Sequence, residues 1–248
     1  MAGTIRTGTG GWTYEPWRGT FYPPGLRQKD EQAYAVEHLT AIEINATYYR
    51  LQSPKSFAAW AKVAPEGFRY AVKASRYATN RTRLAEAEAS VAKFVAQGIS
   101  ELGDKLGPLV WQFAPTKRFD PDDFGAFLQL LPCSVDGLPL THALEVRHES
   151  FDDPAFIALA RAANAAIVYA DHPEYPCIDA DTGHLRYARL MQARSDEPTG
   201  YDAGEIAGFA ARAKGWAGNG SDVYMFFING AKERAPAAAM ALRKTLER

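Results

Sequence analysis

The chain has 248 residues, a formal net charge of −1, 47% hydrophobic residues and 23% charged residues. This length and mixed composition are typical of a globular protein with a sizeable hydrophobic core. The near-zero net charge argues against a general nucleic-acid coat, although it is compatible with a local basic patch. The two cysteines, Cys133 and Cys177, form neither a metal motif nor a disulfide framework, and no apolar run approaches the length of a membrane span. We therefore expect a cytoplasmic protein with no membrane partner.

Short apolar segments alternate with amphipathic segments along the chain. Strands are expected over residues 5–11, 41–49, 68–75, 108–113, 142–148, 165–171, 184–190 and 222–229. Helices are expected over residues 30–39, 53–64, 84–102, 122–131, 155–163, 202–216 and 235–248, and several of them follow a Ser-Pro or Asp-Pro pair that suits a helix start. Residues 172–183 contain two prolines and no helical period, so this connection is expected to be irregular.

Eight alternating strand and helix units in a chain of 248 residues have the size and rhythm of a (β/α)8 TIM barrel, an α/β fold. No linker rich in proline, glycine or serine divides the sequence. We therefore expect a single TIM-barrel domain over residues 1–248, with an irregular connection between strands six and seven. An open, doubly wound sheet is the alternative arrangement of the same units.

Polar residues recur near the C-terminal ends of the expected strands, which is where TIM barrels carry their chemistry. Alternation within residues 41–49 places Ile42 and Ile44 on one face and Glu43 and Asn45 on the other. A carboxylate inside an apolar strand is costly unless it has a partner or a task. The same alternation along the other strands predicts a ring of inward-pointing polar side chains: Glu43, Asn45, Lys73, Gln112, Glu145, Arg147, Asp171, Arg189 and, with ambiguous parity, Asn229.

Three cations and three carboxylates converge in this expected ring. Such groups can pair with one another, bind a polar ligand, or act as acids and bases. Glu145, Glu43 and Lys73 are the candidate catalytic residues, and Arg147 and Arg189 are the candidate anchors for an anion. For Lys73 the first expectation is an ion pair with Glu43, the second is contact with a phosphate or carboxylate, and the last is Schiff-base chemistry.

An aromatic segment, residues 12–22, follows the first expected strand and, with Tyr48 and Tyr49, would crowd the same end of the barrel. Trp12 and Tyr14 are candidates for stacking on a sugar or a base, and the alternative is an aromatic lid packed over the barrel. A nucleic-acid site would instead use the cations of the loops after the third and fourth strands, which are Arg76, Arg81, Arg83, Lys117 and Arg118.

Two further patterns give weaker indications. His148 and His172 could join Glu145 and Asp171 around a metal ion, but their spacing matches no metal motif. The glycines of residues 8–11 could offer backbone N–H groups to an anion, yet no helix begins directly behind them as in a dinucleotide fingerprint. We expect no metal ligands, and the sequence identifies no cofactor.

Six motifs are spread along the chain: GTGGWTY (8–14), WRGTFYP (17–23), EINATYYRL (43–51), YAVKA (70–74), WQF (111–113) and LEVRH (144–148). Together they resemble the YecE-like TIM-barrel family, which is catalogued as domain of unknown function 72. The resemblance runs from about residue 4 to beyond Asn229. It implies a (β/α)8 barrel and no established reaction.

Two positions depart from the pattern of the family that the chain resembles. Many members end the seventh strand with Arg-Leu-His-Gly, whereas this chain has Arg189-Leu-Met-Gln192. Many end the eighth strand with Asn-Asn or Asn-Asp, whereas this chain has Phe227-Ile-Asn229-Gly230. A role that depends on the absent histidine cannot be transferred to this chain.

The sequence therefore predicts a TIM-barrel protein, expected to be an enzyme that binds a small polar or anionic ligand at the C-terminal rim. A sugar phosphate or a nucleotide is the expected ligand class. One alternative is a nucleic-acid binding or processing protein, suggested by similarity of the barrel to endonuclease-IV-like folds. Another is a non-catalytic barrel that senses a ligand. The sequence leaves the oligomeric state open.

Overall fold

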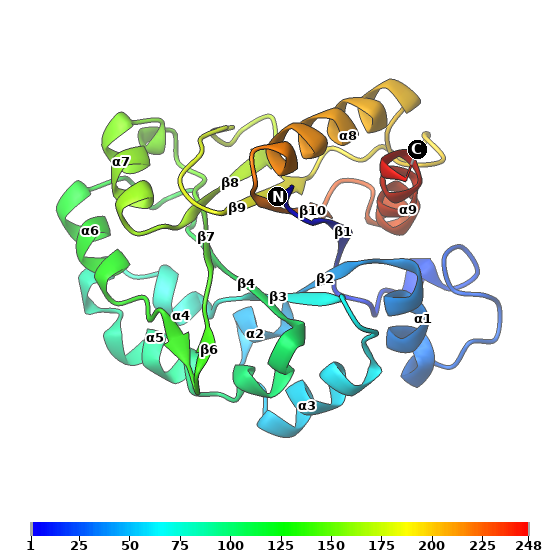
Figure 1. Ribbon diagram of the computed structural model, residues 1–248, viewed down its shortest axis with the longest axis horizontal. Coiled ribbons are helices and arrows are strands. Elements are labelled where there is room, and N and C mark those ends of the chain that lie inside the picture. The colour runs from blue at the N-terminus through cyan, green and yellow to red at the C-terminus, as the bar shows by residue number, and fades with distance from the viewer. Residues whose placement is uncertain (1, 248) are drawn as a thin grey trace.

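Eight parallel strands close into a barrel in the computed structural model, which describes residues 2–247. Around the barrel the strands follow the order β1, β10, β9, β8, β7, β4, β3, β2. The helices lie outside this ring of strands (Figure 1). The expected α/β TIM barrel is confirmed, and the open doubly wound sheet is wrong because β1 pairs with both β2 and β10.

The elements have the following bounds. The barrel strands are β1 (Ile5–Gly10), β2 (Ala41–Ile44), β3 (Arg69–Lys73), β4 (Leu106–Gln112), β7 (His142–Glu145), β8 (Ala166–Asp171), β9 (Leu185–Leu190) and β10 (Asp222–Phe227). The helices are α1 (Glu31–His38), α2 (Ala46–Tyr49), α3 (Pro54–Val63), α4 (Arg76–Thr79), α5 (Glu88–Val95), α6 (Pro121–Gln129), α7 (Pro154–Ala162), α8 (Ala203–Gly218) and α9 (Ala235–Leu246). A small hairpin of β5 (Ser134–Val135) and β6 (Leu138–Pro139) was not expected. Residues 172–183 contain no helix, as expected, and Arg248 of the last expected helix lies outside the described residues.

Helix starts follow the residue pairs identified in the sequence. Ser53, Asp120 and Asp153 precede α3, α6 and α7, and each side chain accepts a hydrogen bond from a backbone N–H of the first turn. A proline occupies the start of each of these helices, where no intrahelical N–H bond is lost. These caps set the residue at which each helix begins.

The barrel interior combines very small and very large side chains. A Cβ atom on Gly8 of β1 would lie 1.8 Å from the carbonyl oxygen of Ala41, so only glycine allows β1 and β2 to approach this closely. Ala41 and Ala71 pack inside the barrel with the rings of Tyr187 and Phe226, whose centroids are 5.2 Å apart. Aromatic side chains from β9 and β10 therefore fill the space that the small residues of β1 to β3 leave open.

The single long helix expected over residues 84–102 is wrong. Only α5 is α-helical there, and 3-10 turns flank it at Leu84–Glu86 and Ile99–Lys105. Gly98 has a φ of 102°, and a Cβ atom at this position would lie 2.7 Å from Pro54. The alanine-rich composition favours a helix, but the close approach of this turn to the start of α3 ends it.

Six strands end earlier than the apolar pattern suggested, and three of these earlier ends leave expected site residues outside their strands. β2 ends at Ile44, β7 at Glu145 and β10 at Phe227. Asn45, Arg147 and Asn229, expected within strands, therefore lie in the segments just beyond them, and Asn229 has a φ of 65°. These segments form part of the C-terminal rim of the barrel.

Candidate ligand-binding site

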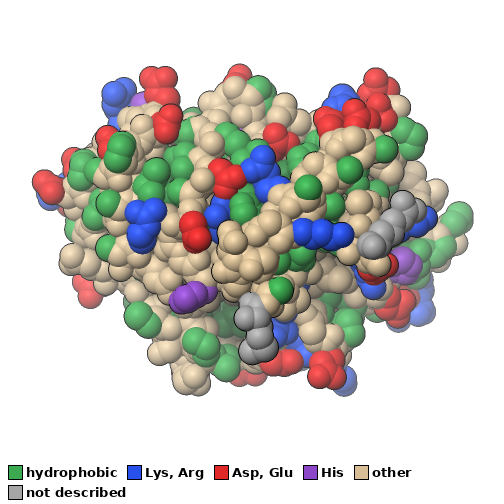
Figure 2. All heavy atoms as spheres, turned by 45° about the horizontal axis from the view of Figure 1, so that its top comes forward, with side chains coloured by type: hydrophobic (Ala, Val, Ile, Leu, Met, Phe, Trp, Pro, Cys, Tyr) green, Lys and Arg blue, Asp and Glu red, His purple; other side chains and the backbone are tan. Residues whose placement is uncertain are grey.

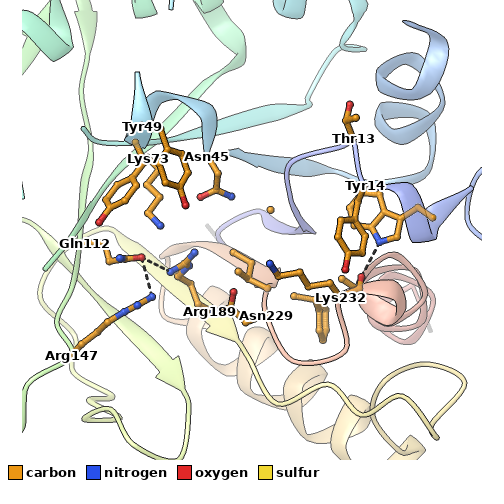
Figure 3. A pocket seen from close by; sticks show the side chains of 16 residues that line it. Thr13, Tyr14, Asn45, Tyr49, Lys73, Gln112, Arg147, Arg189, Asn229 and Lys232 are labelled. Carbon is orange, nitrogen blue, oxygen red and sulfur yellow. Dashed lines mark hydrogen bonds between the residues drawn. The ribbon is translucent and has the colours of Figure 1, made fainter. Parts of the chain in front are cut away.

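A cavity of about 450 Å³ opens at the C-terminal ends of the barrel strands. Lys73, Gln112, Arg147 and Arg189 lie on one side of it, and Tyr14 and Lys232 lie on the opposite side (Figure 3). Its lining contains the cations Lys73, Arg147, Arg189 and Lys232, the amides Asn45, Gln112 and Asn229, and the aromatic residues Tyr14, Trp17, Tyr48, Tyr49 and Phe227. No carboxylate is among the described side chains that line this cavity.

Two carboxylates lie behind the lining and are bound to its arginines. Arg189 pairs with Glu43, at 3.0 Å from Nη2 to Oε1, and with Oε2 of Glu145. The Tyr187 hydroxyl donates to the other oxygen of Glu43 at 2.6 Å. Glu43 and Glu145 are 0% exposed, and Arg189 is 2% exposed. This ion-paired layer therefore forms the buried floor of the cavity.

Arg147 extends the same network toward the opening. Its Nε donates to Oε1 of Glu145 at 2.8 Å, and its Nη2 donates to Oε1 of Gln112 at 2.9 Å. Burial alone would raise the pKa of Glu145, but the charges of Arg189 and Arg147 outweigh burial and lower that pKa below its ordinary value. Glu145 therefore stays ionised and holds both guanidinium groups in place.

Lys73 is buried without such a partner. Its side chain is 8% exposed, and its ammonium lies 4.4 Å from the centroid of the Tyr48 ring. No ion pair or hydrogen bond joins its Nζ to any residue between 2 and 247. Burial, reinforced by repulsion from Arg189, lowers the pKa of Lys73 to about 8. The expected ion pair between Lys73 and Glu43 is wrong, because Arg189 and Tyr187 already occupy both oxygens of Glu43.

The two asparagines of the expected ring line the cavity from loops. Asn45 lies beside β1, where a Cβ atom on Gly10 would come within 2.8 Å of its Nδ2. Asn229 follows β10, and its Nδ2 contacts the Sδ of Met191 at 3.5 Å. The glycine at position 10 therefore makes room for the Asn45 amide at the cavity wall.

Asp171 was expected in the ring, and the structure places it elsewhere. The register pairs Ala170 with Arg189 and Asp171 with Leu190. Because Arg189 points into the barrel, Asp171 points outward toward α8. There it accepts a hydrogen bond from Gln192 at 2.6 Å and lines a second hollow of about 470 Å³. Burial raises the pKa of Asp171 above its ordinary value.

The aromatic segment divides between packing and cavity lining. Trp12, expected at the site, does not line the cavity and packs edge-on against Trp60, with ring centroids 5.4 Å apart. Trp17, Phe21 and Tyr22 are buried, in agreement with a packed lid. Tyr14 does line the cavity, as expected.

Trp17, Tyr48 and Tyr49 line the cavity at the end of the barrel where aromatic side chains were expected, whereas Lys232 is a lining residue that the sequence analysis missed. Tyr48 and Tyr49 belong to the motif EINATYYRL, but this stretch was interpreted as strand, whereas α2 turns both rings toward the cavity. The Trp17 indole N–H donates to the Lys232 carbonyl at 2.8 Å, which fixes the loop after β10 against the aromatic segment. A lysine just beyond the eighth strand was the available signal for Lys232.

The cations suggested for nucleic acid are partly engaged in structural contacts. Arg81, Lys117 and Arg118 line a separate hollow of about 500 Å³. Lys117 pairs with Asp123 at 2.8 Å, and Arg81 donates to Ser90 at 2.8 Å. Acidic and basic side chains are interspersed over the face shown in Figure 2.

The histidines near the strand ends serve local turns. His148 Nδ1 accepts from the backbone of Ser150, and His172 Nδ1 accepts from the backbone of Glu174, both at 3.1 Å. Within residues 2–247, no group of three or more His, Cys, Asp or Glu side chains is placed to hold a metal ion. None of the helices in the same range is long and apolar enough to cross a membrane.

Comparison with known proteins identifies the family. The model of "Protein of unknown function DUF72" matches residues 6–248. UPF0759 protein YunF of Bacillus subtilis is 29% identical over 143 residues, which cover 55% of this chain and about half (49%) of that relative. A DUF72 family protein of Thermotoga maritima superposes with a TM-score of 0.80 at 22% identity, covering 99% of this chain and 100% of the other. A DUF72 family protein of Enterococcus faecalis superposes with a TM-score of 0.73 at 18% identity, covering 99% of this chain and 98% of the other. Both of these solved DUF72 proteins share the fold of this chain, which therefore belongs to the DUF72 family, a family of unknown function.

Proposed function

We propose that this protein is an enzyme that binds a small anionic ligand of the sugar-phosphate or nucleotide class at the C-terminal rim of the barrel. The observation that carries this proposal is the cavity lining, which holds four cations and no carboxylate among the described side chains. The volume of about 450 Å³ suits a small metabolite. Like charges converging on one concave surface attract an anion strongly, because the surrounding protein screens them less than water does.

The site has more positive than negative side-chain charge, and the excess is available to bind a ligand. Glu43 and Glu145 balance the charges of Arg189 and Arg147 from behind. Lys73 and Lys232 have no ion pair with another described residue. This surplus of two positive charges matches a phosphate dianion or a compact dicarboxylate. Arg147 Nη1 has no partner within residues 2–247 and supplies a donor for the same group.

The proposal gives the glutamates and the lysine different roles. Glu43 and Glu145 do not line the cavity, so we assign them to positioning the arginines. Lys73 faces the cavity, and its pKa of about 8 leaves roughly a tenth of the amine neutral at neutral pH. An amine that titrates near the working pH can accept and return a proton efficiently. We therefore assign proton transfer to Lys73.

Arg147→Ala is expected to weaken the binding of inorganic phosphate or a sugar phosphate by about 10- to 100-fold, since it removes one charge-assisted donor worth roughly 1.5–3 kcal/mol. Isothermal titration calorimetry would measure the change. Arg118→Ala is the matched control, because Arg118 lies in the separate hollow of the fourth loop. Equal affinities in both variants and the wild type would remove the basis of the proposal.

A nucleic-acid ligand would give a different pattern. Binding through Arg81, Lys117 and Arg118 would fall steeply with added salt and would be weakened by Arg118→Ala rather than by Arg147→Ala. We expect a fluorescently labelled oligonucleotide to show no such binding. Strong salt-dependent anisotropy changes would favour nucleic acid over the small anion. A barrel that only senses its ligand would bind the small anion and return it chemically unchanged.

A further inference from the structure

We propose that Lys73 is a nucleophile that forms a Schiff base with an aldehyde or ketone carrying a phosphate or carboxylate group. This inference rests on the proposed function, because it places the anionic group of the ligand in the same cavity. It extends that function by specifying a carbonyl group within reach of the Lys73 amine. The sequence ranked this chemistry below an ion pair with Glu43 and below contact with an anion, and the structure excludes the ion pair with Glu43.

The surroundings of Lys73 fit an amine that reacts. It is the only buried lysine within residues 2–247, and its end faces the cavity (Figure 3). Its ammonium lies 4.4 Å from the centroid of the Tyr48 ring. A lysine kept for structure would be expected to pair with a carboxylate, and the two nearby carboxylates are both bound to Arg189. Lys73 therefore remains free for the ligand while its neighbours are held in place.

The charges around Lys73 favour its neutral form, which is the form that has a lone pair. The groups that act on it come from several elements: Tyr48 of α2, Glu43 of β2, Glu145 of β7, Arg147 in the segment beyond it, and Arg189 of β9. Burial and Arg189 lower the pKa of Lys73, and Glu43 with Glu145 limit that lowering. Desolvation next to another cation is a recognised way to activate an amine.

The reaction needs no partner beyond the carbonyl compound. The Nζ lone pair attacks the carbonyl carbon, the C–O π bond opens, and the oxygen takes up a proton to give a carbinolamine. The nitrogen releases one hydrogen as a proton that replaces the one taken up, the carbinolamine then loses its hydroxyl group and the remaining N–H hydrogen as water, and a C=N bond remains. Arg147 and Lys232, which line the same cavity, would hold the anionic group of the ligand during these steps.

Reductive trapping tests the proposal. The protein is incubated separately with dihydroxyacetone phosphate, glyceraldehyde 3-phosphate, pyruvate and pyridoxal 5′-phosphate, each with sodium borohydride. Reduction of an imine adds the mass of the probe minus one oxygen atom, and peptide mapping locates the modified lysine. We expect at least one probe to label Lys73 about tenfold faster than any exposed lysine. For the sugar phosphates, the uncharged counterparts dihydroxyacetone and glyceraldehyde should label Lys73 far more slowly.

Two variants and one competitor separate the outcomes. Lys73→Met should abolish the preferred adduct, whereas Lys93→Met, which removes an exposed lysine of α5, should leave it unchanged. Inorganic phosphate should slow the labelling of Lys73. If phosphate binds in calorimetry but none of the four probes labels Lys73 preferentially, the Schiff base is wrong and the proposed anion site stands. If phosphate and the sugar phosphates also fail to bind, the proposed function is wrong as well.

Discussion

Glu145→Gln is expected to lower the free energy of unfolding by about 3–5 kcal/mol, the usual effect of removing one partner from a buried ion pair. Glu145 is fully buried and bonds to both Arg189 and Arg147. A neutral amide in its place leaves Arg189 with Glu43 alone and leaves Arg147 with no ionic partner among the described residues. Urea denaturation would measure the loss, and anion affinity should fall with it because Arg147 is no longer held at the cavity wall.

The pH dependence of this loss gives a second check. The neighbouring arginines lower the pKa of Glu145 in the folded state below its ordinary value of 4.5. A carboxylate of this kind stabilises the fold fully above that ordinary value, and the stabilisation disappears as the pH falls through the lower, folded value. The difference in free energy of unfolding between the wild type and Glu145→Gln should therefore become smaller as the pH falls. Glu149→Gln is the control, because Glu149 is exposed, and a similar loss in both variants would contradict the buried network.

Lys73→Met is expected to stabilise the protein, by up to about 3 kcal/mol at neutral pH, while abolishing turnover. Holding an ammonium whose pKa has dropped from 10.5 to about 8 disfavours the folded state, because each tenfold shift in protonation corresponds to about 1.4 kcal/mol. Methionine keeps a similar apolar length without the charge. A functional group maintained against stability is a common feature of active sites.

The sign of the pH effect follows from the same values. Below pH 8 the folded protein carries the full penalty of the buried ammonium, and the penalty disappears as the pH rises from about 8 to 10.5. The advantage of Lys73→Met should therefore be largest below pH 8 and vanish near pH 10.5. Thermal unfolding across this range would measure it, with the exposed Lys62→Met as control. A variant less stable than wild type at neutral pH would mean that Lys73 has a structural partner.

The alternation of inward and outward side chains along the strands predicted much of the site from sequence. Glu43, Lys73, Gln112, Glu145 and Arg189 all lie at the C-terminal end of the barrel, as alternation along short strands indicated. Parity failed for Asp171 because β8 is apolar on both faces, so its pattern does not say which residues face inward. Only the pairing of Asp171 with Leu190 on the next strand shows that the Asp171 side chain points out of the barrel.

The partners within the site could not be read from sequence. Neighbouring strands suggested Glu43 beside Lys73, yet the guanidinium of Arg189 reaches Glu43 from β9. That contact joins β9 to β2, which are not neighbours in the sheet, so it depends on the closure of the barrel. Tyr48 was expected at this end of the barrel but within a strand, whereas the strand gives way to a helical turn directly after Asn45.

An NMR titration of the Lys73 side chain, with and without inorganic phosphate, tests the central property of the cavity most directly. An unpaired amine beside bound arginines should titrate at about pH 8 in the free protein. Phosphate should raise that midpoint, because an anion in the cavity stabilises the ammonium. A midpoint near the ordinary lysine value of 10.5, unmoved by phosphate, would show that Lys73 is solvated or paired and would contradict the anion site.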